Sequence, residues 1–273
     1  MPRAANQTSG RIRVGIGGWN FAPWRNNFYP AKWPQKRELE YASGRLTAIE
    51  INSTFYRPQT AKTYANWRQQ TPDGFVFSLK APMFATQTTN LDSAAKTIKR
   101  FVFAGLAELG DRLGPLSWQF GENRAFDRDW FAAFLDLLPA ELDGRPLRHV
   151  LEVRHESFMC AAYLDLARAH RVPTVFTDSP DYPSFADLTG DFVYARLMRS
   201  EASIANGYPD DELDAWAQRA RTWANGGQPD DLPRMDAAGK ASIHPRDVFI
   251  YFISAAKERN PAAAMALIER VGR

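Results

Sequence analysis

Charged and polar residues recur at one kind of position in this sequence, at the end of short apolar runs that are typical of β-strands. These run ends carry Asn52, Lys80, Gln119, Arg154, Asp178 and Arg196. Lysine and arginine side chains that converge would suit an anion, with phosphate or carboxylate as the natural ligand. Glu50, Glu152 and Asp178 are candidates for acid–base catalysis, with Glu50 and Glu152 one layer below the rim. The residue types therefore predict a polar site for a small anionic ligand, without naming the substrate.

The order of elements along the chain explains why these side chains would meet. Eight strand-like runs are each followed by helix-like or loop sequence, and this alternation predicts an α/β fold, a closed (β/α)8 barrel of eight parallel strands. Known barrel enzymes work at the C-terminal ends of their strands. The runs cover residues 11–17, 47–52, 75–80, 115–120, 148–154, 173–178, 192–197 and 247–252.

Side-chain alternation along a strand decides which residues face the barrel interior. In the second run the apolar residues Ile49 and Ile51 should face the helices, which puts Glu50 and Asn52 inside. The same argument places inside Gly15, Gly17, Ser78, Lys80, Glu152, Arg154, Tyr194 and Arg196. Buried charges are costly unless paired, so an internal network of salt bridges is the alternative to a ligand pocket. The concentration of charge at strand ends favours the pocket.

Helical periodicity fills most intervals between the runs. The predicted helices cover residues 34–43, 60–70, 92–109, 128–138, 157–169, 210–223 and 260–271. After the sixth run only a short helix near Phe185 fits, so we expect one barrel helix to be degenerate. Two connections are long. We interpret the aromatic segment 18–33 as a lid that covers the ligand, and the polar, glycine-rich segment 224–246 as mobile.

Length and composition agree with one globular domain. The chain has 273 residues, of which 45% are apolar and 24% charged, and a barrel of this kind needs about 250 residues. We expect residues 1–10 to be a disordered lead-in and residues 11–273 to form the barrel domain. The sequence has no long apolar run and no secretory signal, and its single cysteine, Cys160, cannot form an intrachain disulfide. These features predict a cytoplasmic location without a membrane partner, and they leave the oligomeric state open.

The charge balance and the metal-binding residues are only weakly informative. A net charge of +3 from 34 basic and 31 acidic residues does not favour a dedicated nucleic-acid binder. Of the four histidines only His155 lies at a predicted strand end, so no multi-zinc site is predicted. One divalent cation held by Glu50, Glu152 and Asp178 would fit the preference of Mg²⁺ or Mn²⁺ for oxygen. The cofactor is otherwise unknown.

Six segments resemble a known family, the YecE-like family, also called domain of unknown function 72. They are VGIGGWNFAPWRNNFYP, IEINSTFYRPQ, FVFSLKAP, LEVRHESF, VFTDSPDYPS and FVYARLM, in this order along the chain. The resemblance implies a (β/α)8 barrel related in shape to the group that contains endonuclease IV and xylose isomerase, and no established activity. The polar signature of the family falls on Trp19, Glu50, Asn52, Thr54, Phe55, Tyr56, Lys80, Glu152, Arg154, His155, Asp178 and Arg196.

The chain departs from the family pattern at one rim of the expected pocket. Many members carry a His-Gly pair after the seventh strand, where this chain has Met198 and Arg199. Many also carry an Asn-Asn pair after the eighth strand, where Ser254 and Lys257 lie nearby. Lys257 therefore adds a further contact for an anion. The histidine-rich metal set of endonuclease IV is not reproduced.

The sequence leads to three hypotheses on function. The first is a hydrolase, lyase or isomerase, or a ligand-binding relative, for a small phosphorylated or sugar-like substrate. The residues expected to bind this ligand are Trp19, Asn52, Tyr56, Lys80, Arg154, His155, Arg196 and Lys257. The second hypothesis is nucleic-acid binding or phosphodiester hydrolysis like that of endonuclease IV, which is an analogy of fold alone. The third is a non-catalytic regulatory or interaction protein.

Overall fold

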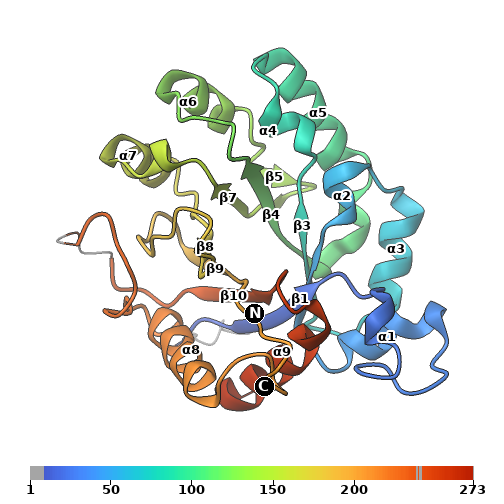
Figure 1. Ribbon diagram of the computed structural model, residues 1–273. Helices are drawn as coiled ribbons and strands as arrows, with labels where there is room; N and C mark the ends of the chain where they lie inside the picture. The colour runs from blue at the N-terminus through green and yellow to red at the C-terminus, as the bar shows by residue number, and fades with distance from the viewer. Residues whose placement is uncertain (1–8, 238, 240–241, 273) are drawn as a thin grey trace, which may run out of the picture.

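The computed structural model describes residues 9–237, 239 and 242–272. Within these residues, eight parallel strands pair in the order β7-β4-β3-β2-β1-β10-β9-β8 (Figure 1). Their bounds are β1 (Ile12–Gly17), β2 (Ala48–Ile51), β3 (Val76–Lys80), β4 (Leu113–Phe120), β7 (His149–Val153), β8 (Phe176–Thr177), β9 (Phe192–Leu197) and β10 (Asp247–Phe252). This order follows the chain around a ring, as the predicted (β/α)8 barrel requires, and confirms it.

The ring closes between β7 and β8, the two ends of this strand order, through a few backbone contacts. The Leu151 amide donates to the Pro173 carbonyl at 2.9 Å, and the Val175 amide donates to the Leu151 carbonyl at 2.8 Å. Leu151 and Thr174 form an isolated parallel bridge there. The sixth predicted strand is therefore present, although only its last residues form a regular ladder.

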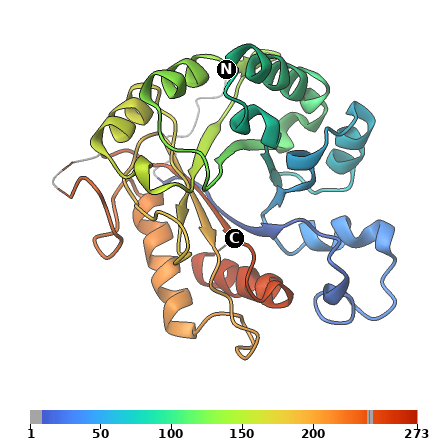
Figure 2. The same ribbon diagram turned by 45° about the horizontal axis from the view of Figure 1, so that its top comes forward.

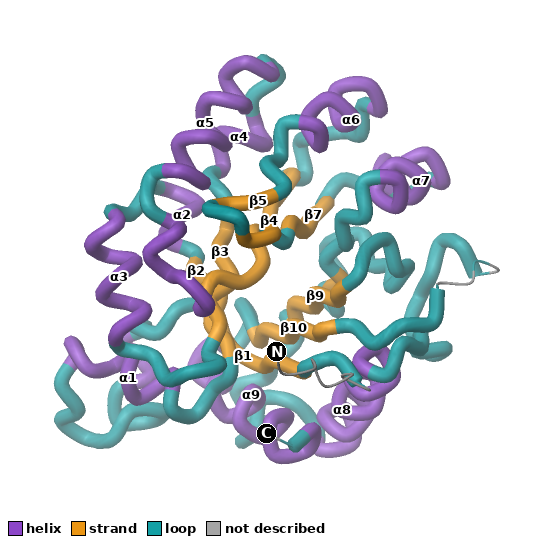
Figure 3. The backbone as a smooth tube through the Cα atoms, turned by 180° about the vertical axis from the view of Figure 1, so that it is seen from behind, coloured by secondary structure: helices purple, strands orange, loops and turns teal. Residues whose placement is uncertain are grey.

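Helices surround the strands on the outside of the barrel (Figures 2 and 3). They are α1 (Glu38–Ser43), α2 (Ser53–Tyr56), α3 (Ala61–Gln69), α4 (Met83–Gln87), α5 (Leu91–Phe103), α6 (Arg128–Asp136), α7 (Ala161–Ala169), α8 (Asp210–Ala224) and α9 (Asn260–Val271). Side chains cap several of them: Thr60 accepts from the Thr63 amide before α3, and Asn90 accepts from the Ser93 amide before α5. A small antiparallel hairpin, β5 (Glu141–Leu142) with β6 (Arg145–Pro146), precedes β7.

The predicted register of the strands is correct. Ile49 and Ile51 belong to the buried cluster between strands and helices. A second, smaller cluster fills the barrel interior, with Val76, Tyr194 and Tyr251 among its members. Alternation along each strand therefore separates a helix-facing apolar layer from an inner layer, and the inner layer carries the charged residues.

Three predicted helices are shorter than expected. The helix expected over 34–43 begins at Glu38, after a 3₁₀ turn over Gln35–Arg37. The helix expected over 92–109 ends at Phe103, because Gly105 adopts a φ of 133° that only glycine tolerates well. A 3₁₀ segment, Leu106–Arg112, continues from there. The helix expected over 157–169 begins only at Ala161, after a 3₁₀ turn over Glu156–Phe158. Helices α2 and α4 are too short for periodicity to reveal, and they were not predicted.

The degenerate barrel position lies between β8 and β9, where residues 178–191 form no helix. Part of the long loop after α8 takes that place. The Ala186 amide donates to the Pro233 carbonyl at 2.7 Å, and Asp187 accepts from the amides of Met235 and Asp236 at 2.8 and 3.0 Å. The stretch around Leu232, which is buried, is therefore anchored rather than mobile, which corrects the expectation for these residues.

The aromatic segment 18–33 is part of the body of the barrel. Trp24, Phe28 and Tyr29 are buried, and Phe28 and Tyr29 each contact Tyr41 of α1 at 5.5 Å between ring centroids. The Trp24 indole also donates to the Lys257 carbonyl at 2.8 Å. These three aromatic side chains cannot stack on a ligand, so the interpretation of the segment as a lid is wrong for them.

The described part of the chain begins at Ser9 and ends at Gly272. Of the predicted lead-in 1–10, residues 1–8 lie outside the described residues, and the Gly10 amide donates to the Ala224 carbonyl at 2.8 Å. No described helix is both long enough and apolar enough to span a membrane.

Candidate functional site

A cluster of buried charges lies inside the barrel toward the C-terminal ends of the strands. Glu50 comes from β2, Lys80 from the end of β3, Glu152 from β7 and Arg196 from β9, while Arg154 directly follows β7. The first four are at most 6% exposed. We call these five residues the strand-end cluster. Alternation along each strand brings them together, as the sequence predicts.

Arg196 is the hub of the strand-end cluster. Its Nη1 donates to Glu152 Oε1 at 2.6 Å, and its Nη2 donates to Glu50 Oε1 at 3.2 Å. Tyr194, two residues earlier on the same strand, donates its hydroxyl proton to Glu50 Oε2 at 2.7 Å. The guanidinium of Arg196 therefore lies between two carboxylates, while its Nε is buried without a hydrogen-bond partner among the described residues.

Arg154 shares the same carboxylate from the rim. Its Nε and Nη2 donate to Glu152 Oε1 at 2.9 and 2.6 Å. Its Nη1 donates to the Tyr182 hydroxyl at 3.2 Å, and the guanidinium carbon lies 4.2 Å from the centroid of that ring. Glu152 Oε2, by contrast, is buried without a hydrogen-bond partner among the described residues. Glu152 is thus a shared acceptor for two arginines.

Lys80 is the least compensated charge of the cluster. Its Nζ donates to Gln119 Oε1 and lies 4.4 Å from the centroid of the Phe55 ring. Burial and the neighbouring Arg196 lower the pKa of Lys80 to about 8. The two cluster carboxylates face three cations, so one positive charge remains without a full partner. That charge is best assigned to Lys80.

The protonation state of Glu152 follows from its surroundings. Burial alone would raise the pKa of Glu152, but Arg196, Lys80 and Arg154 outweigh burial and lower it to about 2. The Glu152 carboxylate is therefore ionised at neutral pH and has a low affinity for a proton. This suits an anchor for arginines better than a general acid.

Asp178 lies apart from the cluster. Its Oδ1 accepts from the Met198 amide, and its Oδ2 accepts from the Tyr208 hydroxyl at 2.9 Å. Burial raises the pKa of Asp178. The side chain therefore ties the end of β8 to the segment that follows β9, and it is directed at backbone and tyrosine rather than at Glu50 or Glu152.

The geometry corrects the metal hypothesis. No three His, Cys, Asp or Glu side chains of the described residues gather into a group that could hold a metal ion. Glu50, Glu152 and Asp178 therefore do not form the three-carboxylate cation site that their strand positions indicated. Two of them bind arginine and the third binds an amide and a tyrosine.

The remaining predicted ligand contacts are spread over the C-terminal face. Trp19 packs on Trp67 of α3, with ring centroids 5.2 Å apart, and so lies outside the strands. His155 accepts from the Ser157 amide at 3.1 Å and caps a 3₁₀ turn. Lys257 Nζ lies 4.5 Å from the Phe21 ring centroid. These three side chains have structural partners away from the strand-end cluster.

Asn52 and Tyr56 lie nearer to the strand ends. Asn52 directly follows β2 and is half-buried, and Tyr56 ends α2 with 75% of its surface exposed. Two further participants were not assigned as site residues from the sequence. Tyr182 comes from the helix-less segment, where no periodicity indicates it, whereas Gln119 is a strand-end residue that position alone could have identified.

A barrel of eight parallel strands with a polar cluster toward their C-terminal ends defines a TIM-barrel protein. Within that class the chain belongs to the DUF72 family, because the family model described as "Protein of unknown function DUF72" matches residues 13–273. The resemblance drawn from the sequence motifs is thereby confirmed. The UPF0759 protein YunF of Bacillus subtilis (strain 168) is 30% identical over 70 residues. That match covers 26% of this chain and 24% of YunF.

Solved structures agree on the fold. A DUF72 family protein from Thermotoga maritima MSB8 superposes with a TM-score of 0.71 at 17% identity, covering 95% of this chain and 98% of that one. A DUF72 family protein from Enterococcus faecalis V583 gives a TM-score of 0.67 at 14% identity and 95% coverage of both chains. A D-psicose 3-epimerase gives 0.54 at 9% identity, covering 95% and 99%. Identities this low show the fold alone.

Proposed function

We propose that this protein binds a small anionic ligand, a phosphorylated one, at the C-terminal ends of the strands, with Lys80 and Arg154 as its cationic contacts. One observation carries the proposal: within the described residues, the three cations Lys80, Arg154 and Arg196 cluster with two carboxylates, Glu50 and Glu152. A buried excess charge is unfavourable, and an anion beside Lys80 would neutralise it.

The cations of the cluster differ in what they can offer a ligand. An ammonium group has three donors, and Lys80 uses one of them on Gln119. Arg154 is nearer to solvent than Arg196, with its side chain 16% exposed against 3%. A ligand that enters from the strand ends would therefore meet Arg154 first and reach Lys80 behind it, with Asn52 and Tyr56 at the rim.

Any chemistry at this site would depend on Lys80 more than on Glu152. A general base works best when its pKa lies near the working pH. The pKa of Lys80 is lowered to about 8, whereas that of Glu152 is lowered to about 2. A hydrolase, lyase or isomerase built on this cluster would therefore exchange protons through Lys80, with Glu152 holding the arginines in place.

The test is calorimetric titration at pH 8 with glycerol 3-phosphate and inorganic phosphate, each in two buffers of different ionisation enthalpy. An anion beside Lys80 raises its pKa, so we expect binding to take up a fraction of a proton, at most about one half at this pH. Lys80→Met should abolish the uptake and weaken binding. Lys36→Met, which removes an exposed lysine elsewhere, should change neither. Unchanged proton uptake in Lys80→Met would contradict the proposal.

The two other hypotheses remain predictions, because no specific contact favours either. Endonuclease IV-like binding predicts affinity for duplex DNA with an abasic site that falls steeply with salt. A non-catalytic role predicts that replacing the cluster charges leaves the cellular function unchanged. Duplex DNA in the same titration separates the first of these from the small-ligand proposal.

A further inference from the structure

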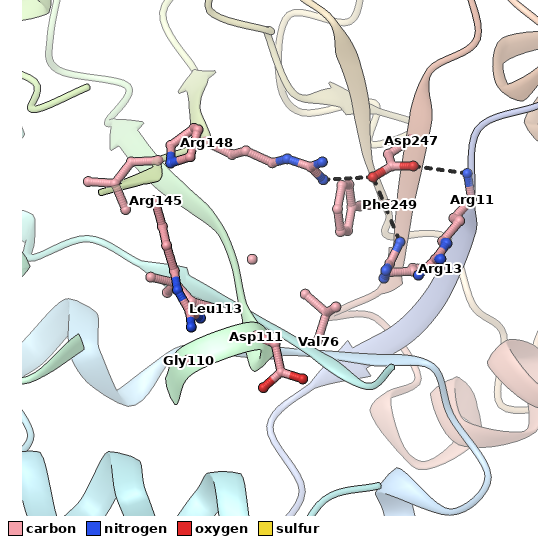
Figure 4. A pocket seen from close by; sticks show the side chains of 13 residues that line it. Arg11, Arg13, Val76, Gly110, Asp111, Leu113, Arg145, Arg148, Asp247 and Phe249 are labelled. Atoms are coloured by element: carbon pink, nitrogen blue, oxygen red, sulfur yellow. Dashed lines mark hydrogen bonds and ion pairs between the residues drawn. The ribbon is translucent and has the colours of Figure 1, made fainter. Parts of the chain in front are cut away.

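Cavities open to the surface at the N-terminal end of the barrel. The described residues line four cavities of about 330 to 590 Å³ at this end. The central one, about 410 Å³, opens between the first residues of β1, β3, β4 and β10 and the β5–β6 hairpin. Its charged and aromatic walls are Arg11, Arg13, Arg145, Arg148, Asp111, Asp247 and Phe249 (Figure 4).

Arg13 is the central cation of this cavity. It precedes Gly15 by two residues on β1 and so faces the barrel interior, where its guanidinium lies 5.7 Å from the Phe249 ring centroid. Its Nε and Nη1 are buried without a hydrogen-bond partner among the described residues. The nearest carboxylate oxygen, Asp247 Oδ2, is 3.9 Å from Nη1, which is too far for a good hydrogen bond.

The nearby acids are already engaged. Asp247 Oδ1 accepts from the Arg11 amide at 2.9 Å, and its Oδ2 accepts from Arg148 Nη1 at 2.8 Å. Asp111 pairs with Arg68 and Arg112. The residues outside the described part of the chain, 1–8, 238, 240, 241 and 273, carry no acidic side chain. Among the described residues, Asp247 is the one carboxylate in ion-pair range of Arg13, and both of its oxygens already accept closer hydrogen bonds.

We infer that Arg11, Arg13, Arg145, Arg148 and Phe249, which we call the arginine basin, form a second anion site for the phosphate group of a small phosphate monoester. All four cations are arginines, whose planar guanidinium groups bind phosphate oxygens in pairs. The cavity volume lies in the range of small-molecule sites. Val76, Leu113 and Phe249 supply apolar wall for the organic part of the ligand.

The local electrostatics agree with this assignment. Burial, with Arg11 and Arg148 nearby, lowers the pKa of Arg13 despite the opposing effect of Asp247. A guanidinium in such a partly buried place interacts more strongly with an incoming dianion than an exposed arginine would, because the surrounding protein screens the charges less than water does. In Figure 4, Arg148 reaches across to Asp247, with Arg11 and Arg13 on the β1 side and Arg145 on the hairpin side.

The arginine basin is independent of the strand-end cluster and can be tested separately. We would titrate glycerol 3-phosphate and AMP, with glycerol and adenosine as uncharged controls, against the Lys80→Met protein, which lacks the strand-end lysine. Arg13→Met and Arg145→Met should each weaken binding of the phosphate esters by about tenfold or more, because a charge-assisted contact is lost. Arg128→Met removes an exposed arginine on α6 and should leave binding unchanged.

Arg145→Met keeps the test decisive if Arg13→Met does not fold, because the Arg145 side chain is exposed and its replacement should not disturb folding. Equal loss of affinity in Arg128→Met would overturn the proposal, as would failure of both esters to bind at about 10 mM. Displacement of a bound ester by duplex DNA, with a steep dependence on salt, would overturn it in favour of a polymeric partner.

Discussion

The two ends of this barrel use the same residue types in opposite ways. At the C-terminal end, Arg196 donates to Glu152 and Glu50, and Arg154 donates to Glu152 again. At the N-terminal end, Arg13 keeps two buried nitrogens without partners, 3.9 Å from its nearest carboxylate. A buried, closely paired arginine and a half-buried arginine with a distant carboxylate look alike in a sequence. They differ in which change to the side chain would destabilise the protein.

The largest effect should come from breaking the shared carboxylate. Glu152→Gln removes the negative charge that two guanidinium groups share, and losing one partner of a buried ion pair typically costs about 3–5 kcal/mol. Urea unfolding at pH 7 measures this loss. Glu156→Gln, an exposed change four residues later, is the matched control and should cost less than about 0.5 kcal/mol. Similar stabilities for the two variants would mean that the ion pairs at the C-terminal end of the barrel contribute no more to stability than an exposed residue does.

The next largest effect is a pH dependence of protein stability that comes from the titration of Lys80. The pKa of this lysine is lowered from 10.5 to about 8 in the folded protein. Between these values the unfolded chain still binds the proton that the folded chain has released, so stability rises with pH from about 8 to about 10.5. Below pH 8 the cost of burying the charge is fully present.

Over this pH range the free energy of unfolding should rise by about 3 kcal/mol, because each unit of pKa shift corresponds to about 1.4 kcal/mol. Urea midpoints measured across this range for wild type and Lys80→Met isolate the lysine from tyrosines that titrate nearby. The difference between the two curves should grow by that amount. Parallel curves would mean that Lys80 is solvated or paired more strongly than its contacts indicate.

Removing the Tyr194 hydroxyl tests the same C-terminal end of the barrel and should have a smaller effect on stability. Its hydroxyl donates to Glu50, the ion-pair partner of Arg196, at 2.7 Å, while the hydroxyl of Tyr251 pairs with the hydroxyl of Ser78 at 2.6 Å. Hydrogen bonds to charged groups contribute about 1.5–3 kcal/mol, and neutral ones about 1 kcal/mol. Tyr194→Phe should therefore destabilise the protein more than Tyr251→Phe in the same unfolding experiment. The reverse order would show that Glu50 is held by Arg196 alone.

Strand alternation accounts for what could be predicted of the site. It is a local property, so Glu50, Lys80, Glu152 and Arg196 face inward as expected. The prediction fails where a strand ends. Gly18 has a φ of 75°, which turns the chain outward and carries Trp19 onto α3 instead of over the pocket.

Nonlocal contacts account for what could not be predicted. Asp178 follows a strand with only two residues in regular pairing, so alternation says little about where its side chain points. Its partners Met198 and Tyr208 come from later in the chain. The arginine basin also depends on the two-stranded hairpin that contains Arg145, which is too short to leave a pattern in the sequence. The fold followed from periodicity, but pairing of side chains across elements did not.

The smallest predicted effect on stability, that of Arg13→Met, best tests the difference between the two ends of the barrel. Arg13→Met replaces a buried cation that has no close partner, so the lost charge carries little stabilisation and the apolar side chain can pack on Phe249. Without ligand, we expect the unfolding free energy of Arg13→Met to lie within about 1 kcal/mol of the wild-type value, whereas Glu152→Gln should lose several kcal/mol. Glycerol 3-phosphate should stabilise the Lys80→Met protein much more than the variant that carries both Lys80→Met and Arg13→Met, since a ligand stabilises only the state that binds it. A large loss of stability without ligand would instead make Arg13 a structural residue, paired more strongly with Asp247 than 3.9 Å implies.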